Sequence, residues 1–257
     1  SRGGTVTIVA GHGAGEEFSV GGAFSVSAGI GGSDTGGSVF IKSGYGSTST
    51  SGSITTSTMN GGEMGASGRV EFTTGSSSSG NTGSVLIATG TADIGGGGAI
   101  EVSVGAGDSG HGGSITVTAG DTSQSDKTGG SISIHAGDGT GICNGCGGHV
   151  AITAGQGYTS SGGSCWITSG YGAKYSSGNM TIATANAGIA GVSGHLIIST
   201  GTASNGNSGW INITSGDSAG GRGGNMTIVV GTGDSGTGGN ATVVAGASSV
   251  RTGGSLI

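Results

Sequence analysis

The sequence has no proline, little charge and no long apolar run. Charged residues make up 8% of the 257 residues, and aromatic residues make up 4%. The seven Lys and Arg are scattered, so no basic patch faces a phosphate backbone and nucleic acid is not an expected partner. No apolar run approaches the length of a membrane span. The absence of proline suits a chain in which nearly every backbone N–H donates a hydrogen bond.

The sequence also lacks an arrangement of catalytic side chains. No Ser/His/Asp set and no pair of carboxylates recurs at one place, and the adjacent Glu16 and Glu17 face apart in an extended chain. We therefore expect a protein that is not an enzyme and needs no cofactor. Single aspartates follow several of the apolar runs, and the expected role of such residues is to form turns. Calcium binding is the alternative role, but their spacing does not match the nonapeptides of calcium-binding β-rolls. These aspartates are Asp108, Asp121, Asp138, Asp217 and Asp234.

A unit of about fifteen residues recurs along the whole chain. It reads Gly-Gly-Ser-Val-x-Ile-x-Ala-Gly, followed by about six small polar residues. The second glycine, here called the marker glycine, occurs seventeen times, at Gly4, Gly22, Gly37, Gly52, Gly68, Gly83, Gly98, Gly113, Gly130, Gly148, Gly163, Gly178, Gly194, Gly209, Gly224, Gly239 and Gly254. A fixed short period is typical of an array in which each unit packs only against its neighbours.

The spacing of the markers indicates an internal duplication. The first eight intervals span 126 residues and the last eight span 124, with long and short steps in nearly the same order. We interpret residues 1–257 as one continuous solenoid array of two eight-unit blocks, about 3–128 and 129–252, plus the start of a third. The sequence ends inside a unit, which suggests a segment of a longer array.

Each unit carries two apolar positions on one face of an extended run, except that Thr56 interrupts the second row. The first apolar row lies two residues after each marker, as at Val39, and the second lies four residues after, as at Ile41. A small residue follows six after the marker, as at Ser43. Strict alternation with β-branched residues is typical of a strand with one buried face. We predict an all-β fold: a narrow, single-domain parallel β-solenoid (β-helix) with about 15 residues per coil and roughly 16–17 coils.

Two enlarged loops stand out because they carry large or reactive side chains. The first contains Glu16, Glu17 and Phe18, and the second contains Ile142 and Cys143. One repeat per coil would bring both loops to the same side, about 38 Å apart at roughly 4.8 Å per coil. We predict lateral contacts between neighbouring molecules there; a duplicated insertion without function is the alternative.

The three cysteines and four glycosylation motifs have structural alternatives. For Cys143 and Cys146 we predict a disulfide that staples the loop, with free thiols or metal and redox chemistry as alternatives. Cys165 lies in the first apolar row and is interpreted as a buried apolar residue. Asn-x-Thr motifs make N-glycosylation a candidate modification, with amide ladders between stacked coils as the alternative. The four motifs begin at Asn179, Asn212, Asn225 and Asn240.

Two families resemble these repeats. The segments 112–120 and 147–155 resemble the coils of filamentous-haemagglutinin-type adhesins and related Gly/Ser-rich surface solenoids. That resemblance implies a rod-like stalk outside the cell. The fifteen-residue step, the Thr content and the low charge are similar to antifreeze β-solenoids, which implies an ice-binding face. However, both outward strand positions are Thr in only one complete unit, at Thr116 and Thr118.

From these observations we expect a non-enzymatic structural protein, a segment of a long extracellular or cell-surface filament, stalk or coat. Self-association into filaments or lateral bundles is the expected partnership, with no membrane span. An ice-binding β-solenoid is the first alternative function. An adhesin that binds carbohydrate or another surface is the second, so glycans and ice stay open as ligands.

Overall fold

A computed structural model describes residues 3–14, 19–141 and 145–257. Within these ranges the chain is extended, with bends and short turns at the ends of loops, and it forms no helix and no strand. The prediction of an all-β fold, a narrow parallel β-solenoid with about 15 residues per coil, is therefore wrong. The physical reason lies in the loops, where the chain turns back and leaves in a new direction, so successive repeats do not stack on each other.

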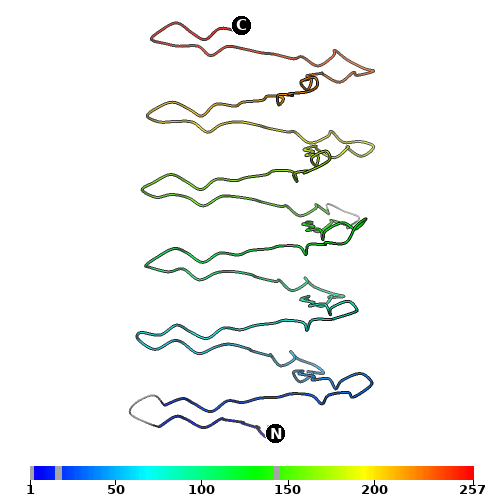
Figure 1. The fold of residues 1–257 in the computed structure, drawn as a ribbon. Coiled ribbons are helices and arrows are strands. Elements are labelled where there is room, and N and C mark those ends of the chain that lie inside the picture. Colours follow the sequence, from blue (N-terminus) through cyan, green and yellow to red (C-terminus); the bar gives the residue numbers. More distant parts are fainter. Residues whose placement is uncertain (1–2, 15–18, 142–144) are drawn as a thin grey trace. The chain divides into compact units, whose positions relative to one another are not determined.

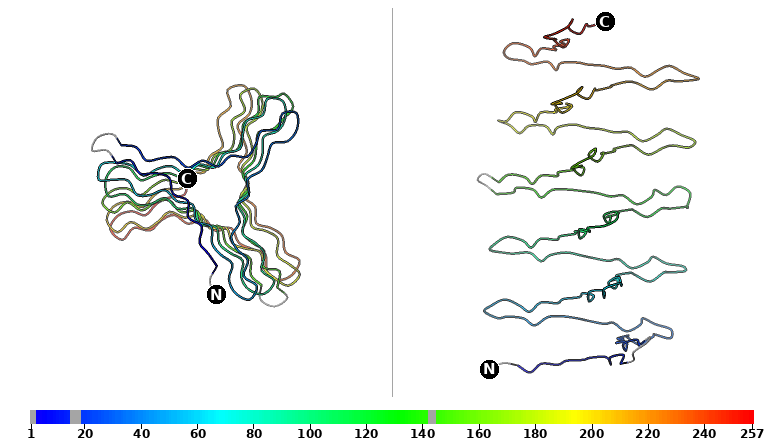
Figure 2. Two further views of the ribbon diagram at one scale, coloured as in Figure 1. Left: turned by 90° about the horizontal axis from the view of Figure 1, so that it is seen from below. Right: turned by 90° about the vertical axis from the view of Figure 1, so that its left-hand side faces the viewer.

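The chain is described as two units, Ser1–Gly130 and Ser131–Ile257. Within each unit the backbone runs outward to a loop, returns, and continues to the next loop in another direction (Figure 1). Viewed along the winding of a unit, the loops point in three directions, and every third repeat points the same way (Figure 2). A turn therefore contains three repeats, whereas the sequence predicted one.

The marker glycine marks the place where the two sides of a loop come closest. In the loop of residues 29–37, the Gly37 amide donates a hydrogen bond to the carbonyl oxygen of Gly29, at 2.9 Å. A Cβ on Gly37 would lie 3.2 Å from the Cβ of Ala28, the small residue of the preceding repeat. The glycine is therefore required by close approach across the loop, since its φ lies outside the left-handed region.

This hydrogen bond forms only in loops whose small residue is Ala or Ser, but a small residue is not sufficient, because the Gly224 amide makes no such bond although Ser215 occupies the small position. Among the described loops, all those that have the bond carry Ala or Ser at the small position, and none carries Thr or Val. At Thr89 and Thr200 the hydroxyl donates to the carbonyl oxygen of the marker glycine instead, at 3.3 Å. The order of bonded and non-bonded loops is the same in both units. The bonded marker glycines are Gly22, Gly37, Gly52 and Gly130 in the first unit and Gly148, Gly163, Gly178 and Gly254 in the second.

The loop tips are held by short local interactions. The Asp34 carboxylate accepts a hydrogen bond from the Thr35 amide at 2.8 Å, and the Ser77 hydroxyl accepts one from the Gly80 amide at 2.9 Å. Such side-chain turns hold a loop without help from a neighbouring element. These two loop tips are thus held by residues of the loop itself.

No described residue is buried, so neither unit has a core of its own. The apolar rows, which the sequence placed in a core, are open to solvent along their whole length. Cys165 is exposed as well, so its interpretation as a buried apolar residue is wrong for this chain on its own. The reason is again the winding: the next repeat that points the same way lies a full turn away along the chain and does not cover the apolar rows (Figure 2).

Candidate functional site

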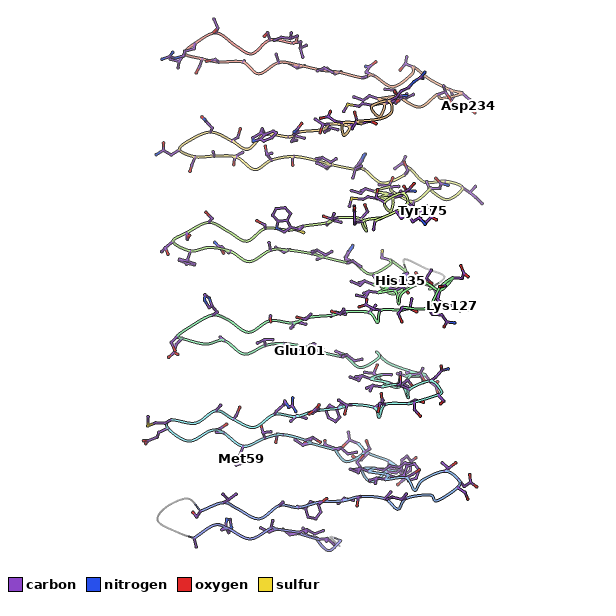
Figure 3. All side chains as sticks on the ribbon, viewed as in Figure 1. Met59, Glu101, Lys127, His135, Tyr175 and Asp234 are labelled. Atoms are coloured by element: carbon purple, nitrogen blue, oxygen red, sulfur yellow. The ribbon has the colours of Figure 1, made fainter. Side chains whose placement is uncertain are left out.

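The described part of the chain has no cavity in which a small molecule would sit. It also has no group of three or more His, Cys, Asp or Glu side chains placed to hold a metal ion. In the second unit, Tyr175 and Asp234 lie at the outer ends of their loops (Figure 3). The candidate site is therefore a repeated surface, and the apolar rows are the largest one.

The geometry across the loops shows which way the rows face. The Cβ direction of Gly37 points at Ala28 on the other side of its loop. Side chains alternate along an extended chain, so Val39 and Ile41, two and four residues further on, share that direction. Both rows therefore face the inside of the winding. We call the surface formed by the two rows the inner face.

The exposed fractions agree with this assignment. On one run, Ile115 of the first row is 56% exposed and Val117 of the second row is 70% exposed. The outward-facing apolar side chains Leu86 and Trp166 are more open, both at 86%. An isolated apolar side chain on a surface is ordinary, but a continuous exposed apolar face in every repeat is typical of an interaction surface.

The backbone along the inner face is also without partners. In the described ranges, the backbone hydrogen bonds lie across the loops or within turns at their tips. The runs between loops, such as residues 114–119, take part in none of them. An extended run with free N–H and C=O groups is a template for pairing with another extended chain. The inner face therefore combines apolar side chains with unpaired extended backbone.

Two charged contacts lie on the outside of the chain. The Arg69 guanidinium donates to the Glu71 carboxylate, two residues along the same run, and both side chains are exposed. The Lys174 ammonium lies 5.4 Å from the centre of the Tyr175 ring. Both are local contacts between near neighbours in sequence, so neither forms a binding site for a partner.

The predicted disulfide cannot be placed, because Cys143 lies outside the described residues. Its predicted partner Cys146 is an exposed thiol in the structure. The pairing stays a prediction.

The lateral-contact side chains Glu16, Glu17, Phe18 and Ile142 also lie outside the described residues. Their predicted alignment assumed one repeat per coil, and three repeats occupy each turn within a unit. The lateral-contact role stays a prediction, but the alignment that motivated it has lost its basis.

The four candidate glycosylation sites are exposed. Asn179, Asn212, Asn225 and Asn240 all lie on the surface of the second unit. Asn225 and Asn240 belong to successive repeats, which point in different directions within that unit. Glycans on one chain would therefore not crowd each other there, and glycosylation stays a prediction.

Sequence reasoning found the inner face but missed the number of repeats in a turn. The signal for the loops was present, since a Gly or Ala eight residues before most markers allows the two sides to meet. No helix in the described part is long and apolar enough to cross a membrane. No protein family, curated protein or solved structure matches the chain.

Proposed function

We propose that this chain is a non-enzymatic structural protein that assembles with other molecules into a filament, stalk or coat outside the cell. The observation that supports the proposal is the inner face, which repeats in both units and is exposed throughout the described chain. A surface that repeats along a whole chain suits assembly, whereas an enzyme concentrates its chemistry in one cleft. The extracellular location rests on the Gly/Ser/Thr-rich, weakly charged composition.

Electron microscopy of the purified chain tests the assembly. We expect rods or fibres whose number rises with protein concentration, because burial of the inner face drives association. Uniform particles with the mass of one 23.7 kDa chain at every concentration would contradict the proposal. For the location, an antibody against the chain should label intact source cells; labelling only after permeabilisation would contradict it.

A further inference from the structure

The strongest unexplained feature is the open interval between successive turns within each unit. Figure 3 draws all described side chains, and they do not fill these intervals. The described side chains on either side are exposed, and the described runs between loops have no backbone hydrogen-bond partner. A wide coil with this surface is not a stable end state for an isolated chain in water, because nothing offsets the conformational entropy lost on ordering it.

We infer that the intervals are occupied by two further copies of this same chain, so that three chains wind together in one coil. The inference rests on the proposed structural role and names the partner that this role requires. In the three-chain coil, each run gains an extended neighbour above and below from the other two chains. Strand pairing then forms between chains, where the single chain has none.

The winding itself fixes the number of copies. Three repeats complete a turn within each unit, so a rotation by one third of a turn places every loop of a copy over the direction of a loop of the first chain. The same rotation moves the copy by one third of the rise per turn. Three copies related in this way divide each interval evenly and close as a cyclic trimer, whereas two copies leave every second interval empty.

The spacing of paired extended chains sets a geometric requirement. Neighbouring strands lie about 4.8 Å apart, so three strands need a rise of about 14 Å per turn. The inner faces of all three chains then point into one shared interior, where apolar rows from successive layers lie against each other. The loops with their polar tips stay outside. Glycine at the marker position lets the two sides of a loop come close together.

A lipid or an unrelated protein fits these intervals less well. A lipid supplies no N–H or C=O groups to the unpaired backbone. An unrelated extended chain would have to present apolar residues inward and turn back at the same fifteen-residue step. Only a chain with this repeat matches both the pairing groups and the loop positions, and another copy has them by definition.

The three-chain coil predicts which residues of different chains become neighbours. Along each of the three loop directions, a repeat of one chain lies one strand spacing from the following repeat of another chain. Glu101, on a run between loops (Figure 3), and Thr116, the equivalent outward residue of the next repeat, therefore adjoin each other between chains. Within one chain they belong to repeats that point in different directions. This pair of residues meets once at each of the three interfaces between chains, so the three contacts join all three chains in a closed ring.

The first test uses the unmodified protein. Sedimentation equilibrium is expected to give three times the 23.7 kDa chain mass. A mass of one or two chains at all concentrations would overturn the inference. Open-ended polymers without a three-chain species would also overturn it but leave the proposed structural function standing. Trimers that never associate further would support the inference and contradict the filament.

The second test identifies the neighbours by disulfide trapping. The double variant Glu101→Cys/Thr116→Cys, oxidised under native conditions, is expected to give a covalent three-chain band on a non-reducing gel. The matched control Leu86→Cys/Thr116→Cys joins equivalent positions two repeats apart, about 10 Å in the three-chain coil and beyond the reach of a disulfide. Equal yields from both pairs, or a ladder without a dominant three-chain product, would overturn the inference.

The native thiols need to be removed for this experiment. Cys143 and Cys146 are replaced by Ser, and Cys165 by Val, which suits its place in the first apolar row. The sedimentation mass of this background without added cysteines must equal that of the unmodified protein. If it does not, the sedimentation result on the unmodified protein decides the inference.

Discussion

The close approach at the marker glycine can be tested most sharply at Gly113. A Cβ on Gly113 would lie 2.6 Å from Cγ1 of Val104 on the other side of the loop. The preceding Gly112 would place a Cβ in open space, with no atom within 4 Å. Gly113→Ala and Gly112→Ala therefore make the same chemical change at adjacent positions in different surroundings.

The structure gives the expected size of the difference. Overpacking of this kind costs about 1–3 kcal/mol. Val104 is 47% exposed and its side chain can turn partly away, so we expect the lower part of that range, about 1–2 kcal/mol, for Gly113→Ala. Gly112→Ala should be neutral or stabilise the protein by up to about 1 kcal/mol, because alanine restricts the unfolded chain.

A second substitution tests whether Val104 is the cause. Val104→Ala removes Cγ1 and leaves only the Val104 Cβ, 3.9 Å from the added carbon, which is an ordinary contact. Gly113→Ala should therefore cost less than about 0.5 kcal/mol in the Val104→Ala background. The coupling between the two substitutions, about 1 kcal/mol, is the quantity that the structure predicts.

Urea unfolding at one fixed chain concentration measures all four proteins, since assembly makes stability depend on concentration. In thermal unfolding, each kcal/mol should appear as a shift of about 2–4 °C for a chain of this size. Equal effects of Gly112→Ala and Gly113→Ala would refute the close approach. An unchanged cost of Gly113→Ala beside Val104→Ala would refute the role of the valine.

Three further predictions concern the inner face, the thiols and the surface charge. Ile115→Asp should abolish the three-chain mass in sedimentation equilibrium, because an unpaired carboxylate buried between chains costs on the order of 3 kcal/mol or more. Thr116→Asp, on the opposite side of the run, should leave that mass unchanged. Equal masses for the two variants would contradict the direction of the inner face. Cys165 should react with a maleimide only after the chains dissociate in urea. A disulfide between Cys143 and Cys146 would leave one labelled thiol in the unreduced, unfolded protein, whereas three labelled thiols would exclude that disulfide. Glu71→Gln should lower the free energy of unfolding by only about 0.2–1 kcal/mol, less in 1 M salt, because its ion pair with Arg69 is exposed; a larger, salt-independent loss would contradict this.

The local geometry of a repeat could be predicted from the sequence because it depends on side-chain size and alternation. The alternation of Val39 and Ile41 with polar neighbours specifies one apolar face, and the structure places both on the inside of the winding. The small residue at Ala28 and the marker at Gly37 are both required where the loop narrows. These relations hold within one repeat or between one repeat and the next, so the local sequence contains them.

The winding could not be predicted, because it depends on what the residues after the strand do. A coil of one repeat requires the eight residues after Ala28 to run straight back along the strand. Instead, they turn back at once, and the Gly37 amide bonds to the Gly29 carbonyl oxygen. Each repeat therefore ends in a new direction. Nearly identical repeats carry no residue that marks how many of them complete a turn, so a pattern of fifteen residues suits one repeat per turn as well as three.

Near-identity of the repeats also raises the question of what fixes the register between paired chains. A chain shifted by one repeat makes nearly the same apolar contacts, since both rows recur at every step. The irregular steps break this degeneracy, because the intervals that end at Gly22, Gly130 and Gly148 are 18, 17 and 18 residues long. A longer loop fits only where the loops next to it leave room. A shift of one chain by one repeat would place every long loop of that chain beside different loops of the other two chains. In a three-chain coil the eight-repeat order of long and short steps would thus select one register, as turn length does in a simple hairpin.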